Sequence, residues 1–217
     1  MSVDAAQTED LIKEKAKLLF FQKGFLNATT QEIADEAGVN RALIHYYFRS
    51  REHMLDIILQ ETIQEKRIRV RAILSSSSPF RVKIANYINA LVDLGLKYPY
   101  LENFIIHETA RNPERAKELC SRDRVKTSDL LRDELELEIA AGRLAPISAE
   151  HFMINLSALT NYPLLAKGIL QTIHGMSDNA YRKFLAERKR VIYRTIFGQD
   201  MPDDISLEQV QSPTPQH

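Results

Sequence analysis

The chain has 217 residues, of which 44% are hydrophobic and 27% are charged, and its 29 Lys and Arg balance its 29 Asp and Glu. This composition is that of a soluble protein with enough apolar residues for one or two cores, and we expect two compact units. The single cysteine, Cys120, excludes an intramolecular disulfide framework. No apolar run approaches about 18 residues and no signal peptide is evident, so we expect a cytoplasmic protein.

The fold class predicted from the sequence is all-α. Only 7 glycines occur, and no segment shows the alternation of apolar and polar residues that marks a half-exposed strand. We expect about nine helices in total.

The first informative segment, residues 29–49, predicts two short helices joined by a tight turn. Thr29 and Glu32 have the spacing of a capping box at the start of the first helix. Gly38 can end that helix with a positive φ, and Asn40 can cap the second. Each helix then has an apolar stripe that can face the other, formed by Ile33, Ala34, Ala37, Leu43, Ile44, Tyr47 and Phe48.

The residues left on the outer face of the second helix are mostly basic or aromatic. They are Arg41, Ala42, His45, Tyr46 and Arg49. The stretch 40–51 contains three arginines and no acid, a local charge of +3 in a chain of net charge zero. Charge concentrated on one exposed helix is a footprint for phosphate, so the segment indicates a DNA-binding helix-turn-helix. A merely solvated helix face is the alternative, but it would not require the capping box and the turn signals.

These residues resemble a known family. The run of residues 28–55, from Ala28-Thr-Thr-Gln to Arg51-Glu-His-Met-Leu55, is similar to the DNA-binding domain of the TetR family of bacterial transcriptional regulators. With the preceding helix and its Gly24-Phe25 turn, the resemblance covers about residues 9–56. Relatives often have Tyr in place of His45 and Lys in place of Arg51, at positions that contact the DNA backbone. Both residues can still donate to phosphate, and histidine can gain a proton near neutral pH.

Nine residues are predicted to contact DNA. Arg41, His45 and Tyr46 are candidates for base edges, and Arg41 is the best suited to fork onto a guanine. Ala42 would meet a thymine methyl group. Residues at the helix ends and flanks should contact phosphate and position the reader rather than specify sequence. The complete predicted set is Thr29, Thr30, Asn40, Arg41, Ala42, His45, Tyr46, Tyr47 and Arg51.

Further helices follow in chain order. Ser50 opens a long linker helix, about residues 52–74, that stops in the Ser75–Pro79 run. Helices are predicted over about 80–97 and 101–110. Asn112-Pro113, an N-cap followed by proline at the first helical position, then predicts a helix of nearly 30 residues ending at Gly142.

Two amphipathic helices and a tail complete the chain. Ser148 can cap one helix and Ser177 another, which ends at Gly198. Residues 199–217 contain four acids, three prolines and no Lys or Arg, so we expect a disordered tail.

The resemblance implies two domains. A three-helix DNA-binding domain would span residues 1–51, and a helical effector-binding and dimerisation domain would span residues 52–198. The predicted pocket residues are the aromatic and polar side chains Tyr87, Phe104, His107, Asn155 and Tyr162. The alternative is that these are core residues, or that His107 is an interface histidine.

The resemblance also implies that the last two helices pair with a second copy as a four-helix interface. The candidate interface residues are Phe152, Leu156, Leu159, Phe184, Leu185, Ile192 and Ile196. The alternative is that both apolar stripes belong to the core of a monomer. A two-fold dimer would place two recognition helices in successive major grooves, about 34–36 Å apart or further, and would read an inverted repeat in double-stranded DNA.

We therefore predict a homodimeric repressor that a small-molecule effector releases from its operator. A regulator without an effector, controlled by a protein partner or acting as an activator, is the alternative. An enzyme is not expected, because the acid–base neighbours His107-Glu108 and Glu150-His151 lie about 100° apart on a helix and do not converge. No cofactor or metal motif is present in the sequence.

Overall fold

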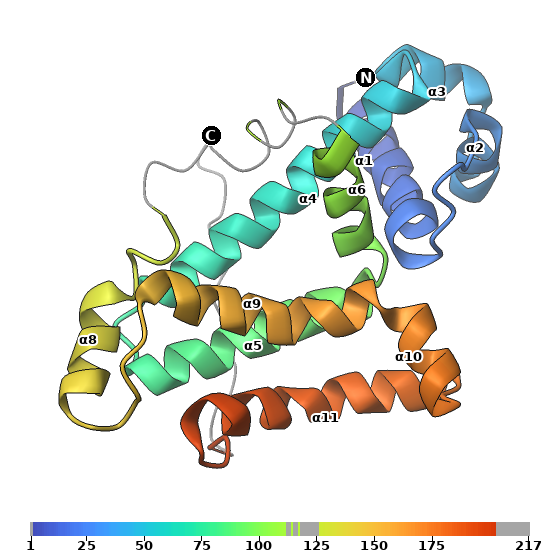
Figure 1. The fold of residues 1–217 in the computed structure, drawn as a ribbon. Helices are drawn as coiled ribbons and strands as arrows, with labels where there is room; N and C mark the ends of the chain where they lie inside the picture. The colour runs from blue at the N-terminus through green and yellow to red at the C-terminus, as the bar shows by residue number, and fades with distance from the viewer. Residues whose placement is uncertain (1, 112–113, 115–116, 118–125, 203–217) are drawn as a thin grey trace. The chain divides into compact units, whose positions relative to one another are not determined.

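The structure is a computed structural model that describes residues 2–111, 114, 117 and 126–202. These residues form ten α-helices and one π-helical turn, η1, and no strand occurs among them. The all-α prediction is confirmed. The elements are α1 Ser2–Lys17, η1 Leu18–Gln22, α2 Thr30–Ala37, α3 Arg41–Phe48, α4 Arg51–Leu74, α5 Phe80–Lys97, α6 Leu101–Arg111, α8 Arg132–Ala140, α9 Ala149–Leu165, α10 Lys167–His174 and α11 Asp178–Phe197 (Figure 1).

The chain divides into two compact units. One comprises Met1–Glu65 and Lys97–Arg122, and the other comprises Lys66–Leu96 and Asp123–His217. The first unit thus includes α1, α2 and α3, together with the first part of α4 and with α6 from much later in the chain. Helix α4 begins in the first unit and ends in the second.

The first unit is built around the packing of α1 and η1 against α2 and α6 and of α2 against α3. The wide turn of η1 lets two adjacent aromatic residues, Phe20 and Phe21, both be fully buried. Their rings pack edge-on against the ring of Phe104 in α6, with centroids 6.2 and 5.6 Å away. Tyr100 donates its backbone N–H to the carbonyl of Phe21, which places the start of α6 on this unit.

The second unit is built around α5, α9 and α11, which run side by side in Figure 1. The Tyr87 hydroxyl lies 3.2 Å from the Ser157 hydroxyl, joining α5 to α9. The Lys189 ammonium donates to the Asp93 carboxylate at 2.6 Å, joining α11 to α5. At Gly95 the helices approach so closely that a Cβ atom would lie 2.4 Å from a methyl carbon of Leu164.

The prediction of one continuous helix ending at Gly142 is wrong in the middle, whereas α8 does end just before Gly142, which has a positive φ. Residues 126–131 form turns, and α8 begins only at Arg132. The backbone N–H groups of Asp129 and Leu131 bond three residues back, and this tight course buries both Ser128 and Leu131. Most of residues 112–125, where the helix was predicted to begin, lies outside the described residues.

The predicted tail begins with ordered contacts. Gln199 accepts a hydrogen bond of 2.6 Å from Arg81, and Asp200 pairs with Arg194. Met201 packs partly buried against the core of the second unit. The remainder of the predicted tail, residues 203–217, lies outside the part of the chain that the structure describes.

Candidate nucleic-acid interface

The local signals predicted for the helix-turn-helix are all present. Thr29 caps α2: its hydroxyl accepts the Glu32 N–H at 3.2 Å, and its own N–H donates to the Glu32 carboxylate at 2.7 Å. The Glu32 carboxylate also accepts the Thr29 hydroxyl at 2.8 Å, and these two bonds to the carboxylate, the backbone one foremost, lower the pKa of the Glu32 carboxyl below its usual value. Gly38 ends α2 in the left-handed region, with φ 64°, and the Asn40 carboxamide oxygen accepts the Ala42 N–H at 2.8 Å to start α3.

The inner face of the motif is buried largely as predicted. Five of the seven stripe residues are buried, namely Ile33, Ala34, Ala37, Ile44 and Phe48. Leu43 and Tyr47 are only partly buried. The ring of Tyr47 meets the ring of Tyr46 edge-on, with centroids 5.0 Å apart, and Tyr46 is itself 75% exposed.

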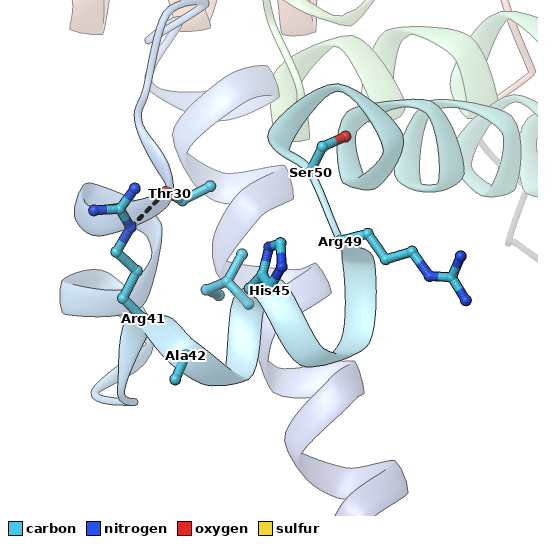
Figure 2. A pocket seen from close by; sticks show the side chains of 7 residues that line it. Thr30, Arg41, Ala42, His45, Arg49 and Ser50 are labelled. Carbon is cyan, nitrogen blue, oxygen red and sulfur yellow. Dashed lines mark hydrogen bonds between the residues drawn. The ribbon is translucent and has the colours of Figure 1, made fainter.

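The outer face of α3 forms a shallow basic concavity against the start of α2. Its lining residues are Thr30, Arg41, Ala42, Ile44, His45, Arg49 and Ser50 (Figure 2). Arg41, Ala42, His45 and Arg49 are exposed, as the helical spacing predicted. This surface has cations and no carboxylate, which suits the phosphates and acceptor-rich base edges of DNA.

Arg41 is held by a neighbour that the sequence did not connect to it. Its Nε donates to the Thr30 hydroxyl at 3.1 Å (Figure 2). Thr30 is the first residue of α2, so the bond spans the two helices of the motif. With Nε occupied, the two terminal Nη groups remain to form an end-on fork.

Arg51 is directed into the protein. Its Nε donates to the Ala28 carbonyl at 2.6 Å, and its Nη2 donates to the Leu26 carbonyl. The guanidinium also lies over the Phe20 ring, 5.2 Å from the centroid, and only 22% of the side chain is exposed. Arg51 therefore fastens the loop that precedes the cap of α2. The phosphate contact expected from the sequence stays a prediction.

Ser50, which was not among the predicted DNA contacts, lies between Arg49 and Arg51 on the rim of the concavity. Its hydroxyl accepts the His53 N–H at 3.0 Å and so caps α4, as the sequence indicated. Arg49 also lines the concavity. Its outward orientation could be predicted from helical spacing, but its backbone conformation could not.

The five predicted pocket residues do not share one environment. Tyr87 is buried in the second unit against Ser157, and Phe104 belongs to the aromatic core of the first unit. The other three, His107, Asn155 and Tyr162, are exposed. His107 lies 3.6 Å from Glu108 through its Nδ1. The effector pocket therefore stays a prediction.

The predicted dimer-interface residues lie in or against the core of the single chain. Phe152, Leu156, Leu185 and Ile192 are at most 4% exposed and belong to the core of the single chain. Leu159, Phe184 and Ile196 are partly buried against the same core. The apolar stripes of α9 and α11 thus pack into the same core as α5, and the pairing of these helices with a second copy stays a prediction.

Other classes of site find no support among the described residues. No group of three or more His, Cys, Asp or Glu side chains in this part of the chain is placed to hold a metal ion. No described helix is both long and apolar enough to cross a lipid bilayer.

Known proteins with the same features are regulators of transcription. The family model described as "Bacterial regulatory proteins, tetR family" matches residues 5–58. The "Probable HTH-type transcriptional regulator YttP" of Bacillus subtilis (strain 168) is 23% identical over 194 residues, covering 88% of this chain and 94% of that protein. The "HTH-type transcriptional regulator RutR" of Escherichia coli (strain K12) is 29% identical over 150 residues, covering 66% of this chain and 67% of that protein.

Solved structures have the same fold over most of the chain. The ketosteroid transcriptional regulator KstR2 of Mycobacterium tuberculosis superposes with a TM-score of 0.62 at 15% identity, over 87% of this chain and 94% of that one. A TetR family transcription regulator from Marinobacter aquaeolei VT8 superposes with a TM-score of 0.58 at 16% identity, over 90% of this chain and 98% of that one.

Proposed function

Because the chain belongs to the TetR family of bacterial transcriptional regulators and has its DNA-binding helix-turn-helix, we propose that it is an operator-binding repressor. It binds an inverted repeat as a homodimer, and a small-molecule effector releases it. An operator-binding protein acts where chromosomal DNA lies, so we expect it in the cytoplasm, and we expect no catalytic activity.

The observation that carries this proposal is the exposed face of α3. A helix of 8 residues is about 12 Å long, close to the width of about 12 Å of the major groove of B-DNA. Its exposed side presents Arg41, Ala42, His45 and Tyr46, while Ile44 and Phe48 anchor it from behind. A short, capped, firmly packed helix with a basic outer face is suited to enter that groove.

Within this proposal the side chains divide by role. Arg41 forks onto a guanine through its two Nη groups, and His45 and Tyr46 contact neighbouring bases. Ala42 lies against a thymine methyl group. Four further residues, Thr29, Thr30, Asn40 and Tyr47, lie at the flanks and contact phosphate. Arg51 donates hydrogen bonds to the carbonyls of Leu26 and Ala28 and so fixes the loop that precedes Thr29 and Thr30.

The proposed dimer surface is the exposed side of the last three helices. Five large apolar side chains there are more than half exposed in the single chain: Ile154, Tyr162, Ile169, Ile173 and Val191. Apolar side chains of this size, gathered on neighbouring helices, favour a protein–protein contact. Pairing through this surface would supply the second α3 that an inverted repeat requires.

The proposal is tested on the DNA that flanks this protein's own gene. We expect the purified protein to protect an inverted repeat in a footprint, with an affinity that falls steeply as salt is raised. Absence of salt-sensitive binding to any duplex would contradict the central claim.

Control by a partner rather than a small molecule is the second candidate, because three of the five predicted pocket residues, His107, Asn155 and Tyr162, are exposed. A thermal-shift screen against metabolites and xenobiotics separates the two. A ligand that binds the folded protein raises its unfolding midpoint, and an effector must in addition bind the DNA-free form more tightly. No shift from a broad library, with DNA binding intact, would favour the second candidate.

A further inference from the structure

Arg49 has an unusual backbone. With φ 62° and ψ −45° it is the one non-glycine residue of positive φ among the described residues. This region of conformational space is sterically disfavoured for residues with a Cβ atom. Arg49 ends α3 by donating its N–H to the His45 carbonyl, and only Ser50 separates it from α4, so the sharp turn is required by the fold.

The turn does not require arginine. At five other positions of positive φ this chain uses glycine: Gly24, Gly38, Gly142, Gly175 and Gly198. Glycine would adopt the same conformation without a steric cost. An arginine at position 49 therefore has a steric cost that glycine would avoid. Some other property of the arginine side chain must compensate for this cost.

The compensation does not come from interactions within the described parts of the chain. The Arg49 side chain is exposed, and its guanidinium forms no hydrogen bond or ion pair with any residue that the structure describes. In this it differs from Arg41, held by Thr30, and from Arg51, held by two carbonyls. A disfavoured backbone combined with an unused cation points to an external ligand.

The position of Arg49 indicates which ligand. It lines the same concavity as Arg41 and His45, and Figure 2 shows Arg41 and Arg49 on the two sides of His45, with Arg41 turned toward Thr30 and Arg49 extending away from it. The two arginines are at the two ends of a helix about as long as the major groove is wide. If Arg41 contacts base edges inside the groove, Arg49 therefore lies at the edge of the groove, beside the sugar-phosphate backbone.

We propose that Arg49 is a phosphate-contacting residue of the DNA reader and that its disfavoured backbone is retained for this contact. The inference rests on the proposed operator binding. Each protomer would then bind one phosphate through Arg49, and this contact would hold the C-terminal end of α3 in the groove. It would add affinity for every sequence and no preference among bases.

Two substitutions test this. Arg49→Gly removes both the cation and the steric cost, so the unfolding midpoint should rise by roughly 2–4 °C while DNA affinity falls. Arg49→Gln removes the cation and leaves the backbone cost, so affinity should fall with the midpoint unchanged. For each phosphate that the protein no longer binds, the slope of log K against log salt should shrink by about 0.9, which is about eight-fold in affinity near 0.1 M salt.

Arg49→Lys and Arg69→Gln are the controls. Lysine keeps the charge and should keep most of the salt slope, whereas Arg69 is an exposed cation of the second unit whose removal should leave the slope unchanged. If Arg49→Gly raises the midpoint while the salt slope stays at the wild-type value, the arginine is incidental and the inference is overturned. That outcome differs from failure of the proposed function, in which the wild-type protein binds no duplex at all.

Discussion

At the scale of single residues, the bond between Thr30 and Arg41 bears most directly on sequence recognition. An arginine whose Nε is already bonded has fewer conformations to lose on binding, and its fork is aimed before DNA arrives. Thr30 would thus act through Arg41 rather than through a base of its own.

We expect Arg41→Ala to cost about 1–3 kcal/mol in operator binding and to relax preference at one base pair. Thr30→Val keeps the shape of the side chain but removes the acceptor, and should lower preference at the same base pair by about 1 kcal/mol. Competition binding with single-base operator variants measures both effects. Thr30→Ser, which keeps the hydroxyl, should restore the preference. Equal losses on operator and random DNA for Arg41→Ala would contradict the base contact.

A second prediction at this scale concerns Arg51. Because its guanidinium bonds two backbone carbonyls, Arg51→Ala should destabilise the first unit by about 2 kcal/mol. Arg51→Lys should recover only part of that stability, since an ammonium cannot reproduce the fork. Denaturant unfolding provides the measurement. A variant of unchanged stability with a reduced salt slope would instead support the phosphate contact expected from the sequence.

At the scale of elements, the close approach of α5 and α9 depends on Gly95. A Cβ atom there would collide with Leu164, so Gly95→Ala should destabilise the second unit by about 1–3 kcal/mol through overpacking. Gly168 on α10 is the matched control, because its Cβ position is open and its φ is ordinary. There alanine should be neutral or stabilising by about 0.5–1 kcal/mol. Equal unfolding midpoints for the two variants would show that α5 can shift away from α9.

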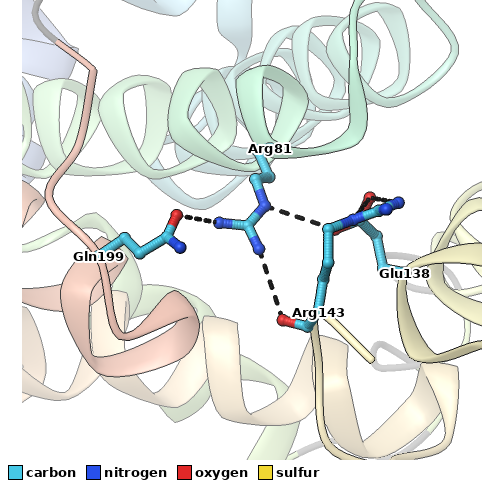
Figure 3. Close-up of polar contacts among 4 residues, drawn as sticks. All are labelled: Arg81, Glu138, Arg143 and Gln199. Atoms are coloured by element: carbon cyan, nitrogen blue, oxygen red, sulfur yellow. Dashed lines mark hydrogen bonds and ion pairs between the residues drawn. The ribbon is translucent and has the colours of Figure 1, made fainter. Parts of the chain in front are cut away.

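Helix α8 is joined to its surroundings by a network of ionic contacts (Figure 3). Arg143 bonds the Glu138 carboxylate at 2.7 Å, and Arg81 reaches Glu138, the Arg143 carbonyl and Gln199. The hydrogen bond from Arg143 is the main cause that lowers the pKa of the Glu138 carboxyl, with Arg81 adding to it and burial opposing it. The network thereby connects α5 and α8 to the residues that follow α11.

The pH dependence of stability follows from this shift. A carboxyl whose pKa is lower in the folded state stabilises the fold fully above its ordinary value of 4.5, and that stabilisation is lost as the pH falls through the folded value. The difference in unfolding free energy between wild type and Glu138→Gln should therefore shrink below about pH 4.5. Chemical denaturation across pH measures it, with Glu136→Gln, an exposed neighbour on α8, as the control. A difference that stays constant down to about pH 2 would contradict the role of this network.

At the scale of the whole molecule, the proposed binding of an inverted repeat requires two copies of the chain, one for each half-site. The apolar stripes of α9 and α11 lie in the core of the single chain, so we propose that association uses the exposed sides of these helices.

We expect Ile154→Asp or Val191→Asp to shift the protein toward monomers in analytical ultracentrifugation, because each buries a charge in the proposed interface. Operator affinity should fall with dimerisation, while the fold measured by circular dichroism persists. Leu137→Asp is the control, since Leu137 is 66% exposed on α8, away from that surface. If the protein stays dimeric with both substitutions, the dimer interface does not lie on the proposed surface.

The sequence by itself determined the DNA reader. The capping box at Thr29, the positive φ of Gly38 and the cap at Asn40 are interactions among residues within a few positions of one another, so local chemistry sufficed to predict them. The tertiary structure alone decided the rest. The partners of Arg51, the membership of Phe104 in the core of the first unit and the inward direction of the α9 and α11 stripes depend on elements far apart in the chain. Helical periodicity reveals that a stripe must be covered, but only packing determines what covers it.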